Sequence, residues 1–490
     1  MNLPIQRLAM ILFAAFALLV AMVSYDQAIA GPRYRDDSRN ARVALDRAGR
    51  ERGGIVTADG EIVAESVADA SDTQSFQRTY PHGSLYAHLV GYTSAIFGDS
   101  GLERSRAGAL ASDRDSTISG LLDALAGEDL RAKGLRITVN HELQQIATAA
   151  LGDQTGAVVA LDPATGAVLA MVSNPSFDPN VLVTLGATEA GDALESDPAT
   201  PLTNRAIREL YAPGSTFKVL TAAAAIESGS TTTDTLFPNP GELDLPGTDA
   251  TISNFADGSC GGTEQVTFQI AFALSCNTVF GIIGMEVGGG DLVAQAEAAG
   301  FNTEVPFEFD VVASAIPTAD EFVNDLPAVA QTALGERDVR VTPLQMAMVA
   351  AAVANDGVVM TPYLVAEVTD ADGQVLETTR PTVWRRAFSP ATATVLEDLM
   401  ERVITSGTGT RASVPRVRVG GKTGTPEREI GAPDAWFIGF GPVNAGPDER
   451  SIAVAVLVES GGDAGESATG GTVAAPIAQQ LLAFWLAGTN

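Results

Sequence analysis

The segment Tyr211–Gly229 reads YAPGSTFKVLTAAAAIESG, and it places a lysine at the head of a stretch that predicts a buried helix. The seven residues after Lys218 are apolar except for one threonine, which is typical of a helix in a protein core. Lysine is rarely buried without a partner, and only three residues of the chain are lysines: Lys133, Lys218 and Lys422. Because a partly buried lysine gives up its proton whereas arginine does not, the position of Lys218 indicates a chemical role.

Ser215 supplies a nucleophile for that role. Pro213 and Gly214 precede it, so Ser215 is predicted to begin the helix, at the positive end of the helix dipole. Residues three apart share one helix face, which makes Ser215 and Lys218 neighbours. Apolar surroundings disfavour the charged amine, and a neutral amine beside a serine hydroxyl is a nucleophile–base pair. A chance S-x-x-K is the alternative, because this pattern alone is weak.

The remaining sequence argues against several other chemistries. The only histidines are His82, His88 and His141, so the region after His141 holds no Ser-His-Asp triad of its own. No His/Cys cluster has zinc-ligand spacing, and no glycine-rich phosphate loop carries a lysine. We therefore expect neither a metal nor a cofactor.

A second of the three lysines begins the sequence Lys422, Thr423, Gly424, Thr425, directly after an alternating apolar pattern that predicts a β-strand. A cation beside two hydroxyls suits a ligand carboxylate, and the glycine permits a close approach of the backbone. The backbone N–H of Thr425 would join that of Ser215 in an oxyanion hole. A lysine at the end of a surface strand is the alternative.

A third short pattern, Ser275, Cys276 and Asn277, lies between the two lysine motifs, within the predicted helix Thr267–Val287. The pattern S-x-N is common by chance. It becomes informative only as a member of an ordered set with the other two.

The N-terminus indicates the compartment. Residues Leu8–Val23 are all apolar and follow Arg7, and with the next two residues the run reaches the lower end of what spans a bilayer. The cationic flank on the N-terminal side places the body of the protein outside the cytoplasm. We expect an uncleaved single-pass anchor. A cleaved signal peptide is the alternative, since Ala28–Ala30 resembles a signal-peptidase site.

Cys260 and Cys276 are the only cysteines, and in an exported protein such a pair predicts a disulfide. Closing a loop of this size contributes about 3 kcal/mol in the chain-entropy model. Two buried free thiols are the alternative.

The net charge of −30 and the pI near 4.3 disfavour binding to nucleic acid or to anionic lipid headgroups.

The chain of 490 residues is long enough for two or three domains. From Gly156 on, an apolar hairpin is followed by helical patterns and then by three strands and a last helix. The predicted strands and helices of this region are the hairpin Gly156–Ser173, helices Val219–Glu227, Thr267–Val287, Pro343–Asn355 and Ala475–Leu486, and strands Arg416–Thr425, Ala435–Pro442 and Ser451–Ser460. This order predicts an α+β domain over residues 154–490, with an antiparallel sheet covered by helices. Residues 31–153 form a smaller mixed domain, and residues 1–30 the anchor.

The motifs S-x-x-K, S-x-N and K-T-G occur in the order found in penicillin-binding proteins and class A β-lactamases. The chain resembles a class B penicillin-binding protein, a monofunctional peptidoglycan transpeptidase with one membrane anchor, and most of all the PbpA-type proteins of actinobacteria. The resemblance runs nearly full length and includes "GLERSRAGAL" (Gly101–Leu110), "TPLQMA" (Thr342–Ala347) and "AWFIGFGP" (Ala435–Pro442). It implies a serine penicillin-recognising fold, and an N-terminal pedestal or dimerisation-like domain.

The resemblance implies that Ser215 attacks the carbonyl of the penultimate D-alanine of a stem peptide and that Lys218 takes its proton. Ser275 would relay a proton to the leaving D-alanine, and Asn277 would hold the substrate backbone. Lys422 would support the proton network. The terminal carboxylate would bind at Thr423 and Thr425. β-Lactams would acylate the same serine. A membrane partner, such as a SEDS-type glycosyltransferase or a divisome protein, is also implied.

Two positions depart from the pattern of such families. Glu336 stands where a glutamine often follows a glycine, and Asp434 where a histidine often precedes Ala-Trp-Phe. Three other functions use the same residues or the same fold: a DD-carboxypeptidase, a β-lactamase, and a non-enzymatic divisome scaffold or β-lactam sensor. No segment after Asn277 resembles the one that carries the water-activating glutamate of class A β-lactamases.

Overall fold

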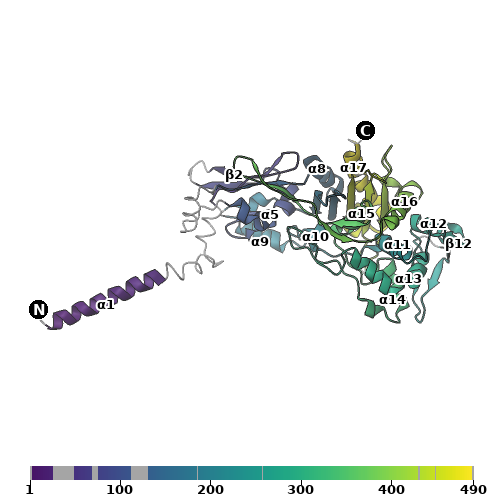
Figure 1. Ribbon diagram of the computed structural model, residues 1–490, viewed down its shortest axis with the longest axis horizontal. Coiled ribbons are helices and arrows are strands. Elements are labelled where there is room, and N and C mark those ends of the chain that lie inside the picture. Colours follow the sequence, from purple (N-terminus) through teal and green to yellow (C-terminus); the bar gives the residue numbers. More distant parts are fainter. Residues whose placement is uncertain are drawn as a thin grey trace.

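The computed structural model of the chain describes residues 3–25, 49–68, 75–111, 131–184, 186–255, 258–428, 431–446 and 449–487. The signal-peptidase pattern at Ala28–Ala30 and the predicted boundary between residues 30 and 31 lie outside these residues. Helix α1 (Leu3–Tyr25) contains the apolar run of the sequence (Figure 1), and none of its residues is buried. By length and composition it is a candidate membrane span.

A five-stranded antiparallel sheet forms the centre of the C-terminal region, in the order β17-β18-β19-β7-β8. Its strands are β7 (Gly156–Leu161), β8 (Val168–Asn174), β17 (Gly420–Gly424), β18 (Ala435–Gly441) and β19 (Ile452–Val458). The predicted hairpin is β7–β8, and the predicted strand Arg416–Thr425 is shortened to β17. The α+β class expected from the sequence is confirmed.

Helices cover both faces of this sheet, which explains why its strands are continuous apolar runs rather than alternating ones. Val159 packs in one core cluster with α15 (Pro343–Val353), whereas its neighbour Val158 packs in another with α8 (His141–Leu151) and α17 (Ala475–Leu486). Successive residues of a strand point to opposite faces, so the two clusters lie on opposite sides of the sheet. Figure 1 shows α8 and α17 next to each other, as their contacts require.

The predicted continuous helix Thr267–Val287 is wrong. The chain forms α12 (Phe268–Ala273), and α13 (Asn277–Ala298) begins after three intervening residues. The break is a property of the backbone at Ser275, whose φ of 59° lies in the left-handed region. A periodicity analysis does not detect it, because the flanking residues on both sides are apolar at helical spacing.

A second, six-stranded sheet has the order β15-β14-β6-β1-β2-β3. Four of its strands come from the N-terminal region and two from the C-terminal one: β1 (Ile55–Val56), β2 (Ile62–Ala68), β3 (Phe76–Thr79), β6 (Gly134–Ile137), β14 (Val365–Thr369) and β15 (Val375–Thr378). Residues 365–378 therefore complete the sheet of the predicted N-terminal domain by pairing β14 with β6. The division at residues 153/154 stays a prediction, and this sheet crosses it.

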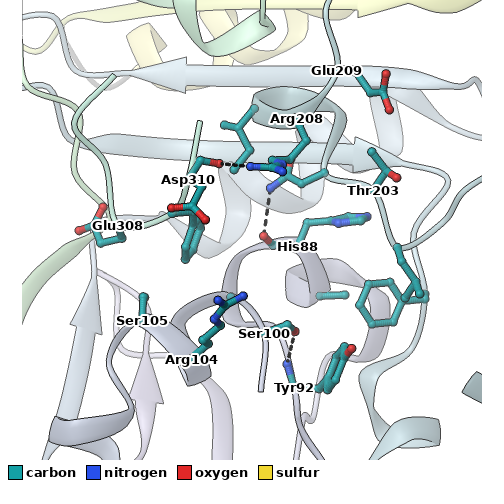
Figure 2. A pocket seen from close by; sticks show the side chains of 17 residues that line it. His88, Tyr92, Ser100, Arg104, Ser105, Thr203, Arg208, Glu209, Glu308 and Asp310 are labelled. Carbon is teal, nitrogen blue, oxygen red and sulfur yellow. Dashed lines mark hydrogen bonds between the residues drawn. The ribbon is translucent and has the colours of Figure 1, made fainter. Parts of the chain in front are cut away.

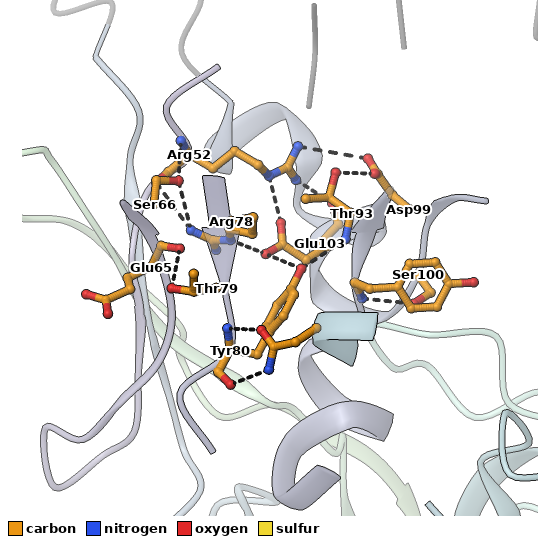
Figure 3. A network of polar contacts seen from close by, with 12 residues as sticks. Arg52, Glu65, Ser66, Arg78, Thr79, Tyr80, Thr93, Asp99, Ser100 and Glu103 are labelled. Atoms are coloured by element: carbon orange, nitrogen blue, oxygen red, sulfur yellow. Dashed lines mark hydrogen bonds and ion pairs between the residues drawn. The ribbon is translucent and has the colours of Figure 1, made fainter. Parts of the chain in front are cut away.

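The N-terminal region is held together by a buried charge network (Figure 3). Glu103 of α5 (Gly101–Ser105) is fully buried and accepts hydrogen bonds from Arg52 Nε at 2.7 Å and from Arg78 Nε at 2.6 Å. The hydroxyl of Tyr80 lies 3.4 Å from the same carboxylate. Both arginine side chains are also buried, and Glu103 is the one carboxylate that contacts both of them. The partly exposed Asp99 adds a longer ion pair to Arg52 alone, at 3.9 Å.

Replacing Glu103 by glutamine should lower the free energy of unfolding by about 3–5 kcal/mol, because Arg78 would lose its counter-charge and Arg52 would keep only the longer ion pair to Asp99. Urea unfolding followed by circular dichroism measures the effect. Glu401→Gln is the matched control, since Glu401 pairs with Arg418, whose side chain is 53% exposed. That exposed pair contributes at most about 1 kcal/mol. Equal losses in both variants would contradict the assignment of Glu103 as the centre of the network.

Candidate active site

Ser215 lies in the 3₁₀ turn η4 (Gly214–Thr216), which continues into α11 (Lys218–Glu227). Gly214 has a φ of 51°, and a Cβ added there would meet the ring of Pro426 at 2.9 Å, so the turn requires glycine. The turn holds the half-buried Ser215 at the start of a helix, one turn before Lys218. The predicted helix start is thus found as a 3₁₀ turn.

The amine of Lys218 is completely buried and points to the break between α12 and α13. Its Nζ donates hydrogen bonds to Asn277 Oδ1 at 2.7 Å and to the carbonyl oxygen of Ser275 at 2.9 Å. It also lies 3.3 Å from the hydroxyl oxygen of Ser275 and 5.3 Å from the centre of the Phe280 ring. The structure therefore joins the S-x-x-K motif directly to the S-x-N motif.

Lys422 reaches the same point from strand β17. Its side chain is also fully buried, and Nζ lies 2.8 Å from Ser275 Oγ and 3.1 Å from the carbonyl oxygen of Thr423. Ser275 Oγ thus lies within hydrogen-bond distance of both amines, and it connects all three motifs. Sequence spacing alone gave no such contact, since Lys218 and Lys422 are separated by some two hundred residues of chain.

Burial sets the charge of these amines. Burial lowers the pKa of Lys422 to about 7. Burial, and in addition the nearby charge of Lys422, hold the pKa of Lys218 well below that of a free lysine, while the carboxylate of Glu336 acts in the opposite sense. Two neighbouring amines of this kind hold a neutral base at neutral pH, as a proton acceptor for a serine requires.

The two residues that follow Ser275 are each held by a contact to a distant segment. Cys276 is disulfide-bonded to Cys260. Asn277 begins α13 and donates from Nδ2 to the carbonyl oxygen of Ser253 at 3.0 Å. For exported protein, we expect the intact mass to show that neither Cys260 nor Cys276 is a free thiol.

Strand β17 ends beside the serine turn. A Cβ added at Gly424 would meet the carbonyl oxygen of Pro213 at 2.7 Å, so only glycine permits this approach. The hydroxyl of Thr423 lies 2.6 Å from that of Thr408, and the hydroxyl of Thr425 accepts from the backbone N–H of Gly470 at 3.1 Å. Thr408 and Gly470 were missed from the sequence, because neither belongs to a motif or to a periodic segment.

Asp434, one of the two departures from the family pattern, accepts two hydrogen bonds within the protein. Its Oδ1 accepts from the backbone N–H of Ser460 at 2.8 Å and from Arg428 Nη1 at 3.1 Å. Asp434 therefore connects the start of β18 to the segment after β19.

Glu336, the other departure, follows a residue that is hydrogen-bonded to η4, the turn that contains Ser215. The residue before it, Gly335, accepts a hydrogen bond through its carbonyl oxygen from the backbone N–H of Gly214 at 3.0 Å. Burial raises the pKa of Glu336 to about 7, although Lys218 opposes this shift. Above pH 7 its charge raises the pKa of Lys218 and so disfavours the neutral amine.

Glu336→Gln should therefore move the pH of half-maximal acylation by penicillin to lower pH, by up to about one unit. Removing the carboxylate lowers the pKa of Lys218, so the neutral base is present at lower pH. Stopped-flow acylation rates between pH 5 and 9 measure the shift, and the exposed Glu304→Gln is the control. A midpoint that stays in place in Glu336→Gln would show that this carboxylate does not act on Lys218.

A separate cavity of about 790 Å³ lies between the N-terminal segments α4 (Ala87–Val90) and α5 and the short helix α10 (Arg205–Arg208) (Figure 2). None of the predicted site residues lines it. Figure 2 shows Arg104 and Arg208 approaching it from opposite sides. This cavity is distinct from the place where the three motifs meet.

Two family descriptions match the chain. "Penicillin binding protein transpeptidase domain" covers residues 156–483, and "Penicillin binding protein A dimerisation domain" covers residues 52–135. Among curated relatives, the chain is 40% identical over 500 residues to a peptidoglycan D,D-transpeptidase PbpA of Mycolicibacterium smegmatis, which covers 99% of both chains. It is 38% identical over 505 residues to the protein of that name from Mycobacterium tuberculosis, covering both chains completely.

Solved structures give the same result. Penicillin-binding protein A from M. tuberculosis, in a ceftriaxone acyl-enzyme complex, matches with a TM-score of 0.83 at 37% identity, over 90% of this chain and 100% of that one. Its imipenem acyl-enzyme complex matches with a TM-score of 0.81 over the same shares of the two chains.

Proposed function

The chain belongs to the family of penicillin-binding protein transpeptidases, and from this premise we propose that it is a serine-type peptidoglycan D,D-transpeptidase acylated at Ser215. The assignment to this family made from the sequence is confirmed. One observation carries the proposed roles of the residues. The hydroxyl of Ser275 lies within hydrogen-bond distance of both buried lysine amines, close to the turn that presents Ser215.

In the acylation step, Ser215 Oγ attacks the carbonyl carbon of the penultimate D-alanine of a stem peptide, and its proton passes to the neutral Nζ of Lys218. The backbone N–H groups of Ser215 and Thr425 are proposed to stabilise the oxyanion that forms. The close approach of Gly424 to Pro213 supports this arrangement, because it brings the end of β17 against the serine turn.

The leaving D-alanine needs a proton as its C–N bond breaks. Ser275 is proposed to relay it, since its hydroxyl contacts both amines and a hydroxyl donates and accepts at once. Asn277 keeps Lys218 in place through its Oδ1 and is proposed to hold the substrate backbone. Both roles depend on the break between α12 and α13, which turns Ser275 towards the lysines.

The terminal carboxylate of the stem peptide is proposed to bind at Thr423 and Thr425. Their hydroxyls donate to it, and Lys422 adds positive potential whenever its amine is protonated. Since burial gives Lys422 a pKa of about 7, substrate binding itself favours its charged form. Thr408 would orient the hydroxyl of Thr423.

In the second step an amine of a neighbouring stem attacks the acyl-enzyme ester and forms the cross-link, while Ser215 recovers its proton. β-Lactams present a similar amide to the same serine and leave it acylated. Each proposed proton transfer uses side chains of this chain.

The domain organisation and location extend the proposal. Residues 1–30 anchor the protein in the membrane, residues 31–153 form a pedestal, and residues 154–490 the transpeptidase domain outside the cytoplasm. Arg7 before the apolar run supports this orientation. Because a transpeptidase joins strands that another enzyme polymerises, we expect a membrane partner of the SEDS glycosyltransferase or divisome class.

The test uses the full chain in detergent with a stem peptide that ends in D-Ala-D-Ala and an added amine acceptor. Mass spectrometry measures released D-alanine, the transfer product and the hydrolysed peptide. We expect transfer product with the wild-type chain and none with Ser215→Ala. Hydrolysis without transfer would instead indicate a DD-carboxypeptidase, and a folded protein without either product would indicate a scaffold.

A further inference from the structure

Two of the three histidines of this chain meet, with a glutamate, outside the active site. The side-chain ligand atoms of Glu61, His82 and His141 all lie within 4.8 Å of one another. His82 Nε2 lies 3.0 Å from a carboxylate oxygen of Glu61, and the two imidazole rings are 4.8 Å apart between centres. In a chain so poor in histidine, this convergence calls for a specific explanation.

The three side chains come from three separate segments. Glu61 directly precedes β2, His82 directly precedes the 3₁₀ turn η2 (Gly83–Tyr86), and His141 is the first residue of α8. The first two belong to the N-terminal region, whereas α8 packs on the central sheet of the transpeptidase region. The sequence did not predict the cluster, because its members have no short spacing.

Further contacts orient His141 as metal ligands are usually oriented. Its Nδ1 is hydrogen-bonded to the hydroxyl of the buried Tyr86 at 2.8 Å, so Nε2 is the ring nitrogen that remains to bind an ion. The carboxylate of Asp59 accepts from the backbone N–H of His141 at 3.1 Å and from Asn140 Nδ2 at 3.2 Å. This carboxylate offsets the positive end of α8, which would otherwise disfavour a cation there.

We propose that Glu61, His82 and His141 form a binding site for a divalent transition metal of the Zn²⁺ class, which joins the N-terminal region to α8. Two imidazoles and one carboxylate, with a water in the fourth position, are a ligand set that Zn²⁺ accepts. The site is open to solvent, since the Glu61 side chain is 50% exposed and that of His82 22%.

Little movement is needed to reach the geometry of a bound ion. Zn²⁺ places its nitrogen and oxygen ligands about 2.0–2.2 Å away, so three tetrahedral ligand atoms would lie about 3.3–3.6 Å from one another. The pair Glu61–His82, at 3.0 Å, is already within about half an ångström of that separation. Rotation of the exposed Glu61 and a small shift of one ring supply the rest. The ion would replace the hydrogen bond between Glu61 and His82.

The experiment uses the full chain in detergent, purified without a polyhistidine tag and stripped with a chelator. Calorimetric titration with Zn²⁺ should give one ion per chain, and Co²⁺ should produce the visible absorption bands of a four-coordinate site. His82→Gln and His141→Gln should each weaken Zn²⁺ binding at least tenfold. Tyr86→Phe should weaken it by about tenfold as well, because the orienting hydrogen bond is lost. Added Zn²⁺ should raise the thermal midpoint of the wild-type chain but not that of His82→Gln or His141→Gln.

Glu65→Gln is the matched control, since Glu65 lies on β2, the strand that Glu61 directly precedes, but is not a member of the cluster. It should bind Zn²⁺ as the wild-type chain does. Acylation by penicillin serves as the check that each variant is folded. Absence of stoichiometric binding, or binding that the His82 and His141 variants leave unchanged, would overturn the proposal. The cluster would then be no more than a hydrogen-bonded contact between His82 and Glu61.

Discussion

Replacing Lys218 by methionine is expected to slow acylation of Ser215 by penicillin about 10²–10⁴-fold while the fold is kept, which is the range that a general base contributes. Methionine fills the buried space of the lysine stem but cannot accept a proton. The second-order rate of adduct formation, measured by stopped-flow and intact mass, gives the effect.

Lys133→Met is the control for this variant, because Lys133 is the one lysine outside the motifs and it is exposed. Losing the amine leaves Asn277 Oδ1 and the Ser275 carbonyl without a donor, so we also expect a loss of about 1–3 kcal/mol in stability. The rate is therefore compared for the folded fraction, determined by circular dichroism. A folded Lys218→Met that acylates at nearly the wild-type rate would refute the role of Lys218 as the base.

Lys422→Met should slow acylation about 10²-fold, because Ser275 then keeps only one of the two amines that lie beside its hydroxyl. The same kinetic measurement applies. The wild-type rate should also depend on a group that titrates near pH 7, and this dependence should change in the variant, since burial places the pKa of Lys422 at about 7.

A double variant separates a joint role from two independent ones. If Lys422 acts through Ser275, then Lys422→Met combined with Ser275→Ala should acylate about as slowly as the slower single variant. Losses that multiply would contradict the proposed relay, because independent groups contribute additively to the activation free energy.

The sequence predicted the central five-stranded sheet well because the apolar runs and turns that specify it are local. The apolar runs of β7, β18 and β19 and the turn between β7 and β8 are each visible within ten or so residues. The three motifs were also found, since each is a short pattern and their order is specific.

Features that apolar spacing and short motifs do not record were not predicted. The break at Ser275 was assigned to a helix, because it depends on a left-handed backbone conformation that apolar spacing does not record. The contact of Thr408 with Thr423 and the pairing of β14 with β6 join segments far apart in the chain. The same holds for the histidine cluster, whose members lie on separate elements.

The most direct test of the central claim is intact mass after mixing the full chain with penicillin, followed over hours, with Ser215→Ala as the control. We predict one stable adduct per chain on Ser215 and none on the variant. An adduct that forms and is lost within seconds would indicate a β-lactamase. No adduct on a folded wild-type chain, or an adduct that persists in Ser215→Ala, would contradict the assignment of Ser215 as the acylated serine.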